Sequence, residues 1–278
     1  MKVRHLEFTV SSTSASNDVL IAVLGYLPIE SFWEDVDLKF YIREDRFNVD
    51  IEKQLNRLSE QWDFDYEIAT VPEMNWNLIW ESSFDPVDID DFCRVRASFH
   101  EAGKGIKYDI LIDPKMAFGT GHHETTYMMI DHMSQLPING KSVWDAGTGT
   151  GVLAILARKM GAAHIFANDI ENEAIENARE NARLNNVDDI QFVKGDIDRV
   201  PRETFDIILA NINRNFLLQN MSILSRQLHS RGHLVLSGFL KGDETMMLKS
   251  LKENDLKVTR RKIKGNWLSL SCTHISIT

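Results

Sequence analysis

The stretch that most constrains the fold of this chain runs from Val143 to Ala157. It begins with the short apolar segment Val143–Ala146, continues through the turn Gly147-Thr148-Gly149-Thr150-Gly151, and ends in the apolar run 152–157. Glycine permits positive φ angles and a close approach of the backbone to a ligand, because it has no Cβ atom. The pattern predicts a buried strand, a glycine-rich turn and a helix whose start offers unpaired N–H groups and a positive dipole end. Such a turn holds a nucleotide-like ligand at the carboxyl edge of a parallel sheet.

The spacing of these glycines distinguishes between two classes of binding motif. A dinucleotide-binding motif has the spacing G-x-G-x-x-G. Here Gly147, Gly149 and Gly151 form G-x-G-x-G, and Val152 occupies the place of the last glycine. This spacing resembles the first motif of class I S-adenosylmethionine-dependent methyltransferases, in which the turn faces the methionine part of the cofactor. A nicotinamide-dependent oxidoreductase is the alternative from a different class, and Val152 argues against it. A glycine-rich turn without a ligand is the structural alternative.

Composition places the chain among ordinary globular proteins. Its 278 residues are 43% hydrophobic and 26% charged, enough for one large or two modest domains. The formal net charge is −10 and no basic stripe is visible, so no direct nucleic-acid specificity is expected. Cys93 and Cys272 form neither a disulfide framework nor a zinc pattern. The N-terminus lacks the apolar region of a signal peptide, and no apolar run approaches the ~18 residues of a membrane span. We therefore expect a cytoplasmic protein that does not enter a membrane.

The first 70 residues carry the patterns of a small separate domain. Half-buried strands alternate with helical patterns here, the strands at 3–10, 38–42 and 64–68, the helices after Asn17 and over 51–62. The order β-α-β-β-α-β fits a ferredoxin-like α+β unit over residues 1–70, without a visible catalytic constellation. Residues 71–114 are then expected to form a linker with a short helix near 71–80 and two short strands, 93–99 and 107–112.

Strand and helix patterns alternate from residue 115 to the end of the chain. This alternation predicts an α/β domain over 115–278, doubly wound around a mainly parallel sheet. Asp169 follows the second strand about 20 residues after the first glycine, where a carboxylate can accept both hydrogen bonds of a ribose diol. The alternative for Asp169 is an ordinary residue at a helix start. Asp196 follows the third strand, where it either meets an adenine amino group or is a plain turn aspartate.

A loop with two adjacent histidines precedes the glycine turn. His122 and His123 lack the i, i+4 spacing of a zinc-binding helix, so no metal site is predicted. The stretch Ala117-Phe118-Gly119-Thr120-Gly121-His122-His123-Glu124-Thr125-Thr126 resembles the A-F-G-T-G-x-H-x-T-T signature of ribosomal protein L11 methyltransferases. Other marks of that family follow in order: Asp145–Gly151, Asp169-Ile170-Glu171 and Ala210-Asn211-Ile212. The chain departs from the family pattern at Glu171 and Asn172, where aspartate and proline are common.

This resemblance implies a cytoplasmic enzyme that methylates amino groups of ribosomal protein L11, on lysine side chains, on the N-terminal amine or on both. S-adenosylmethionine is the implied cofactor and S-adenosylhomocysteine its product. A Rossmann-like class I methyltransferase domain would carry the site, and the flexibly joined N-terminal domain would recognise L11. The expected oligomeric state is a monomer. The implied cofactor contacts are Thr126, Gly147 with Gly149, Asp169 and Asn211, and a loop closing over the site would contain Phe118, Gly119 and His123.

Methyl transfer to an amine requires the neutral amine. A lysine with a pKa near 10.4 costs about 4–5 kcal/mol to deprotonate at pH 7. The side-chain oxygen of Asn211 and the backbone carbonyls of Asn211 and Ile212, at the end of the fourth strand, are the expected acceptors that hold this amine. No residue is a convincing general base, and His123 is the second candidate. Methylation of another protein or of a small molecule is the alternative, because fold and cofactor do not fix the substrate.

Overall fold

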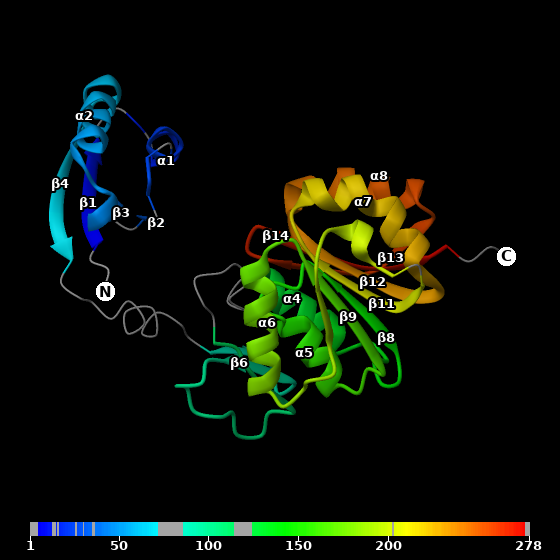
Figure 1. The fold of residues 1–278 in the computed structure, drawn as a ribbon. Coiled ribbons are helices and arrows are strands. Elements are labelled where there is room, and N and C mark those ends of the chain that lie inside the picture. Colours follow the sequence, from blue (N-terminus) through cyan, green and yellow to red (C-terminus); the bar gives the residue numbers. More distant parts are fainter. Residues whose placement is uncertain are drawn as a thin grey trace. The chain divides into compact units, whose positions relative to one another are not determined.

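The computed structural model describes residues 5–12, 15, 17–25, 27–29, 31–34, 37–71, 86–113, 124–201 and 203–275. The chain divides into two compact units, Met1–Ser83 and Phe84–Thr278, and each is described by itself (Figure 1). The short helix expected near 71–80 lies outside the described residues, apart from Val71 at the end of a strand. Phe118, Gly119 and His123 lie outside them as well. Among the described residues, none of the helices has both the length and the apolar character that crossing a bilayer requires.

The first unit is a four-stranded antiparallel sheet with two helices. Its strands lie in the order β2-β3-β1-β4, which is the ferredoxin-like arrangement expected from the sequence. Phe8 and Phe40 stack in its core with ring centroids 4.6 Å apart, beneath Leu20 and Leu55 of the helices. The elements are β1 (His5–Ser12), α1 (Asn17–Leu24), β2 (Ser31–Glu34), β3 (Leu38–Arg43), the 3₁₀ turn η1 (Glu44–Arg46), α2 (Val49–Trp62) and β4 (Phe64–Val71).

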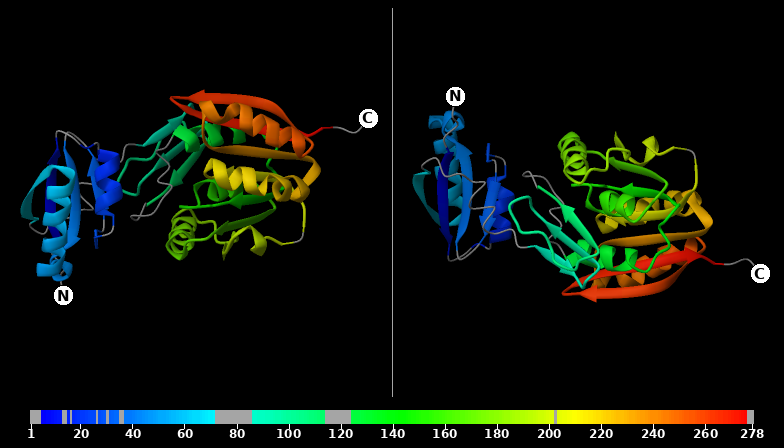
Figure 2. Two further views of the ribbon diagram at one scale, coloured as in Figure 1. Left: turned by 90° about the horizontal axis from the view of Figure 1, so that it is seen from above. Right: turned by 90° about the horizontal axis from the view of Figure 1, so that it is seen from below.

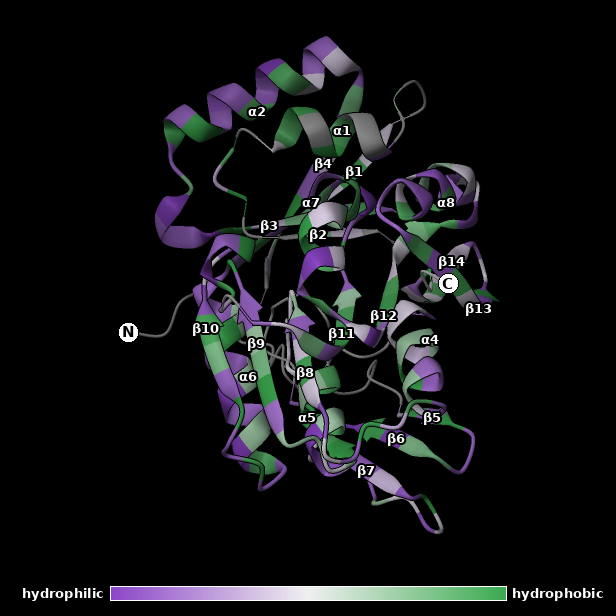
Figure 3. Cartoon of the chain, turned by 90° about the vertical axis from the view of Figure 1, so that its right-hand side faces the viewer, coloured by the Kyte–Doolittle hydropathy of each residue, from purple (hydrophilic) through white to green (hydrophobic). Residues whose placement is uncertain are grey.

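A seven-stranded sheet organises the second unit. Its strand order is β10-β9-β8-β11-β12-β14-β13, and Figure 3 shows β10, β9, β8, β11 and β12 side by side. These five strands are parallel, whereas β14 pairs antiparallel with β12 and β13. The expected doubly wound α/β domain is confirmed. The strands are β8 (Ser142–Ala146), β9 (His164–Asp169), β10 (Gln191–Lys194), β11 (Phe205–Asn211), β12 (Leu228–Leu240), β13 (Leu256–Lys264) and β14 (Trp267–His274).

Helices cover both faces of this sheet (Figure 1). Neighbouring residues of β8 enter different cores: Val143 packs with α4, α5 and α6, and Trp144 packs with α7 and α8. Because both faces are buried, the central strands are apolar along most of their length. The helices are α4 (Glu124–Met133), α5 (Val152–Lys159), α6 (Asn172–Leu184), α7 (Arg214–Gln227) and α8 (Glu244–Glu253), with 3₁₀ turns η2 (Ile197–Arg199) and η3 (Lys241–Asp243).

A small three-stranded sheet completes the second unit. It consists of β5 (Val87–Ile89), β6 (Cys93–Arg96) and β7 (Tyr108–Leu111), drawn in teal to green in Figure 2. Its apolar side chains, among them Val95 and Ile110, share one core with α4, α5 and α6. The two strands expected within 93–99 and 107–112 are therefore present, and they pack as part of the unit that begins at Phe84.

Phe205 provides a test of the core between the sheet and α7. Its buried ring lies 5.9 Å from that of Trp144 and 6.3 Å from that of Phe166, centroid to centroid. Phe205→Ala leaves a cavity, so we expect urea denaturation to show a loss of about 3–5 kcal/mol in the free energy of unfolding. Ile263→Ala, on the exposed side of β13, is the control and should change it by less than about 0.5 kcal/mol. Equal losses in the two variants would contradict this placement of Phe205.

Candidate cofactor and active site

The sheet register brings three chain segments to one edge. Ala146, the last residue of β8, pairs with Asn168 of β9 and with Ala210 of β11. The residues that follow, Gly147, Asp169 and Asn211, therefore reach the carboxyl edge of the sheet at the same level. The strand order reverses at β8, and ligands of open α/β sheets bind at such a switch point.

The glycine turn has the conformation that its sequence predicts. The φ angles of Gly147, Gly149 and Gly151 are 66°, 53° and 83°, a region that side-chain-bearing residues rarely adopt. Close packing adds a second requirement, because a Cβ atom at Gly147 would lie 2.6 Å from Cδ1 of Ile212. At Gly151 a Cβ atom would lie 3.1 Å from that of Ala178, a tight contact that would require a small shift of α6. The predicted strand, turn and helix are thus present as β8, the turn and α5.

Two carboxylates of the chain bind the backbone of this region. Oδ2 of Asp169 accepts a hydrogen bond from the N–H of Gly149 at 2.9 Å, and Oδ1 accepts one from Glu171 at 3.1 Å. Oδ2 of Asp145 accepts from the N–H of Ala154, in the first turn of α5, at 3.2 Å. The sequence predicted unpaired N–H groups at the helix start, and this is corrected for Ala154. The physical reason is that the buried carboxylate of Asp145 accepts its hydrogen bond.

Asp145 is a buried acid directly below the turn. Its Oδ2 also accepts a hydrogen bond from Oγ1 of Thr148 at 2.6 Å. Burial raises the pKa of its carboxyl to about 7, against the lowering effect of the hydrogen bonds from Thr148 and Ala154. The charge of Asp169 raises the pKa further. A fully buried carboxyl with so high a pKa is a feature of functional sites as well as of strained cores.

The end of β11 faces the start of α4. Nδ2 of Asn211 donates to Oγ1 of Thr126, in the first turn of α4, at a long 3.4 Å. The N–H of Ile212 donates to the carbonyl of Ser237 at 3.2 Å. Gly238, with φ +93°, lies against Ile212, and a Cβ atom there would be 2.6 Å from the carbonyl carbon of Ile212. The backbone of Ile212 is therefore fixed by β12 on one side, while its side chain packs on Gly147.

The structure brings together six residues that the sequence singled out: Thr126, Gly147, Gly149, Asp169, Asn211 and Ile212. Asp196 lies after β10 on the same edge, where the N–H of Gly195 donates to the carbonyl of Asp169 at 2.8 Å. Its exposed carboxylate caps η2 by accepting a hydrogen bond from the N–H of Ile197 at 2.6 Å. In the part of the chain that the structure describes, no three His, Cys, Asp or Glu side chains form a metal-binding group.

Three further residues lie at this edge that the sequence patterns did not identify as site residues. Ile170 follows Asp169 and is 60% exposed, an apolar surface beside a carboxylate. In the sequence, Asp145 stands only within a family motif, and no pattern marks Gly238. The available signals were an apolar residue after the acid at a strand end and a glycine inside the apolar stretch that forms β12. Their roles depend on contacts between distant segments, which single-sequence patterns do not reveal.

Fold and site together define the class of this protein as a class I S-adenosylmethionine-dependent methyltransferase. The residues fit the cofactor: the turn is free of side chains at its glycines, Asp169 presents a carboxylate for a ribose, and Ile170 offers an apolar surface for a base. The family model described as Ribosomal protein L11 methyltransferase (PrmA) matches residues 7–274. The chain belongs to this family, as the loop signature and the following motifs indicated, and it is a protein methyltransferase that uses S-adenosylmethionine.

Individual relatives agree with the family model. A protein of Porphyromonas gingivalis named ribosomal protein L11 methyltransferase is 40% identical over 266 residues, covering 92% of this chain and 90% of that protein. One of the same name from Bacteroides thetaiotaomicron is 37% identical and covers 98% of this chain and 100% of that protein. The crystal structure of a ribosomal protein L11 methylase from Lactobacillus delbrueckii subsp. bulgaricus has a TM-score of 0.65 and 28% identity, covering 69% of this chain and 99% of that one. The oxidoreductase alternative is thereby removed.

The buried carboxyl of Asp145 gives a pH-dependent prediction. Below its ordinary pKa of 3.8 this carboxyl is protonated in both the folded and the unfolded chain, and its contribution to stability is fully present. As the pH rises to about 7, the unfolded chain loses the proton while the folded chain keeps it, so this contribution is lost. Asp145→Asn cannot titrate but keeps an oxygen for Thr148 and Ala154. Between these two pH values we expect the free energy of unfolding of the wild type to fall, relative to the variant, by on the order of 4 kcal/mol. Urea denaturation of both proteins across this range measures the difference, and a constant difference would contradict the raised pKa.

Proposed function

We propose that this chain methylates amino groups of ribosomal protein L11, on lysine side chains, on the N-terminal amine or on both. The observation that carries the proposal is the family match over residues 7–274, which spans both units of the chain. The geometry of the second unit supports it, because the glycine turn, Asp169 and Asn211 meet at one edge of the sheet. Methylation of another protein or of a small molecule is the competing possibility.

Incubation with labelled S-adenosylmethionine and a mixture of ribosomal proteins, followed by mass spectrometry, tests the substrate and maps the modified amines. We expect label on L11 and on no other protein to a comparable extent. Label confined to lysine residues, to the N-terminal amine, or on both would decide the type of amine. If label appeared mainly on a different protein, the proposed substrate would be wrong.

The cofactor contacts are part of the proposal. S-adenosylmethionine supplies a methyl group activated by the positive charge of its sulfonium sulfur. Asp169 would bind the ribose diol, since its carboxylate is already oriented by the N–H groups of Gly149 and Glu171. Thr126, Gly147 and Gly149 would line the methionine side, and Asp196 the adenine side beside Ile170. Phe118, Gly119 and His123 belong to the same proposal from the sequence resemblance alone.

Asn211 and Ile212 are the groups proposed to hold the neutral amine. The amide nitrogen of Asn211 donates to Thr126, so its oxygen is the side-chain atom available to accept a hydrogen bond from an amine. Hydrogen bonds to the backbone carbonyls of Asn211 and Ile212 would complete the orientation of the nitrogen. Transfer between two positioned groups depends chiefly on orientation, and a displacement of about 1 Å can cost about a hundredfold in rate. These residues would therefore act by positioning the amine for attack.

Two substitutions separate amine positioning from cofactor binding. Asn211→Ala should lower kcat by about a hundredfold with a smaller change in the dissociation constant of S-adenosylmethionine. Asp169→Ala should instead weaken cofactor binding by about 10- to 100-fold, since it removes a charged hydrogen-bond partner. Calorimetry and steady-state kinetics measure the two effects, with Asn215→Ala, an exposed asparagine of α7, as the control. Equal losses of turnover and affinity in Asn211→Ala would make it a cofactor ligand only.

The domain over residues 1–70, which lies within the first unit, is proposed to recognise L11. Register places Trp33, Lys39 and Tyr41 on the sheet face opposite the helices, because their neighbours Phe32 and Phe40 point into the core. On that face Glu7 accepts hydrogen bonds from Tyr41 at 2.7 Å and from Lys39 at 2.9 Å. Trp33 is 48% exposed, and exposed tryptophans are frequent anchors of protein interfaces. This face combines an aromatic anchor with a fixed polar pair.

Trp33→Ala tests this recognition face. We expect the KM for L11 to rise by about tenfold or more, while the KM for S-adenosylmethionine stays within twofold of the wild type, roughly the effect of losing one interface anchor. Ile68→Ala is the matched control, since this exposed apolar side chain lies on the helix side of the same sheet. If Ile68→Ala raised the KM for L11 as much as Trp33→Ala, the assignment of the face would be wrong.

The remaining parts of the proposal concern the protein in solution. We propose that it is a monomer in the cytoplasm. A lack of nucleic-acid specificity is consistent with the formal net charge of −10, which disfavours contact with phosphate backbones. The interaction with L11 then depends on protein surfaces alone.

A further inference from the structure

Three buried asparagines form a regular row along α6 and its C-cap residue, Asn185. Asn177, Asn181 and Asn185 follow one another at intervals of four residues, so they lie on one face of the helix. Each is at most 5% exposed. Buried amides require hydrogen-bond partners, and all three find them in the chain that ends the small sheet, at residues 111–113.

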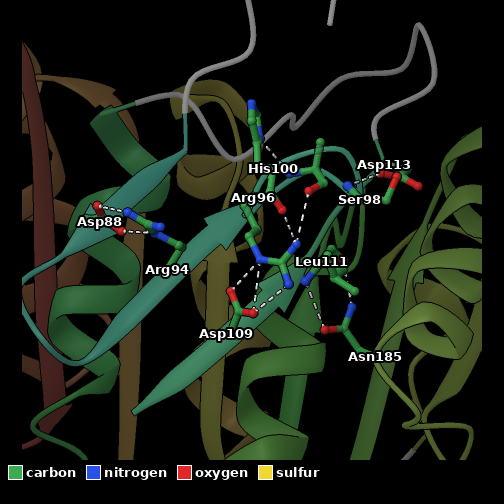
Figure 4. Close-up of polar contacts among 10 residues, drawn as sticks. Asp88, Arg94, Arg96, Ser98, His100, Asp109, Leu111, Asp113 and Asn185 are labelled. Atoms are coloured by element: carbon green, nitrogen blue, oxygen red, sulfur yellow. Dashed lines mark hydrogen bonds and ion pairs between the residues drawn. The ribbon is translucent and has the colours of Figure 1, made fainter. Parts of the chain in front are cut away.

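Asn185 pairs with the edge of β7. Its Nδ2 donates to the carbonyl of Leu111 at 2.6 Å, and its Oδ1 accepts from the N–H of the same residue at 3.0 Å (Figure 4). The side-chain amide therefore presents a donor and an acceptor to β7, as a neighbouring strand would. β7 pairs with β6 on its other side. These contacts fasten α6 to the small sheet and involve no residue of the cofactor turn.

Asn181 makes the same type of contact one turn earlier and extends it to the glycine turn. Its Oδ1 accepts from the N–H of Asp113 at 3.0 Å, and its Nδ2 donates to the carbonyl of Thr150 at 2.9 Å. Asp113 is itself fixed, because its carboxylate accepts from the N–H of Ser98 at 2.7 Å (Figure 4). A single amide therefore bridges the end of the small sheet and the middle of the turn.

This bridge matters because Thr150 lies between Gly149 and Gly151. Both glycines have positive φ angles and no side chain that could restrict the backbone. Asp169 holds the turn on one side through the N–H of Gly149, and Asn181 holds it on the other through the carbonyl of Thr150. Within the turn, the N–H of Gly151 also donates to the carbonyl of Thr148 at 2.8 Å. The orientation of the peptide groups between Gly149 and Gly151 therefore depends on this backbone bond together with the two side chains.

We propose that Asn181 is a positioning residue of the cofactor site, which fixes the glycine turn through the carbonyl of Thr150. It does not contact the cofactor itself. The inference rests on the proposed cofactor contacts of the turn and names a residue that acts through them. Loss of the amide would remove one of the hydrogen bonds that hold the Thr150–Gly151 peptide and would leave its buried carbonyl without this donor. The ordering of the turn would then have to occur on binding, at a cost in affinity.

Asn181→Ala and Asn185→Ala form a matched pair for the test. Both remove a buried amide of this row that binds residues 111–113, so both should lower the melting temperature by similar amounts. Only Asn181→Ala should weaken binding of S-adenosylhomocysteine, by about tenfold in calorimetry, which corresponds to about one lost hydrogen bond. Asn185→Ala should bind within twofold of the wild type. The KM for S-adenosylmethionine should follow the same order, with the KM for L11 unchanged.

Asn181→Asp distinguishes the role of the amide oxygen from that of the amide nitrogen. It keeps the volume and the acceptor for the N–H of Asp113 but replaces the donor to Thr150, so it should weaken binding at least as much as alanine. If Asn181→Ala does not fold, the binding measurement is made on Asn181→Asp instead. Wild-type affinity in a folded Asn181 variant, or equal weakening in the Asn185→Ala control, would overturn the inference. Failure of the wild-type chain to bind S-adenosylhomocysteine would instead contradict the proposed cofactor site.

Discussion

The hydrogen bond from the N–H of Gly149 to the carboxylate of Asp169 joins the two parts of the proposed cofactor site. One part is a turn without side chains at its glycines, and the other is the tip of a neighbouring strand. A glycine-rich turn gains a defined shape from its hydrogen bonds, some within the turn, such as that from the N–H of Gly151 to the carbonyl of Thr148, and some from its neighbours. Asp169 supplies that constraint from β9, and the carbonyl of Thr150 receives a second one from Asn181 of α6. The turn is therefore held between a strand and a helix.

This arrangement depends on a rigid base. β8 lies between β9 and β11, and its side chains alternate between the two cores on either face of the sheet. Close packing on both faces leaves little freedom for the strand ends. Gly147, Asp169 and Asn211 are thus presented at a common level, although they are far apart in sequence. The proposed amine and cofactor sites lie at the ends of the neighbouring strands β8 and β11, whose spacing is about 5 Å.

Sequence patterns predicted much of this, for reasons that are local. The alternation in 3–10 and 38–42 indicated strands β1 and β3, and the glycine spacing indicated the turn after β8. The segment 86–113 was harder to interpret, because its strands are only three or four residues long. So short an apolar run does not reveal which core it joins, and the packing of Val95 and Ile110 against α4 to α6 is a tertiary contact. Ile170 and Gly238 were missed for a similar reason.

The sequence by itself determined the family, the order of the strands and helices, and the residue types available at each strand end. These follow from motifs and periodicities that neighbouring residues encode. Only the tertiary structure decided which polar groups meet: that Asp169 binds the turn, that Asn211 faces Thr126, and that Asn181 bridges Asp113 and Thr150. Such pairs are set by sheet register and helix packing, which arise from burial summed over the whole domain and leave no short-range signature in the chain.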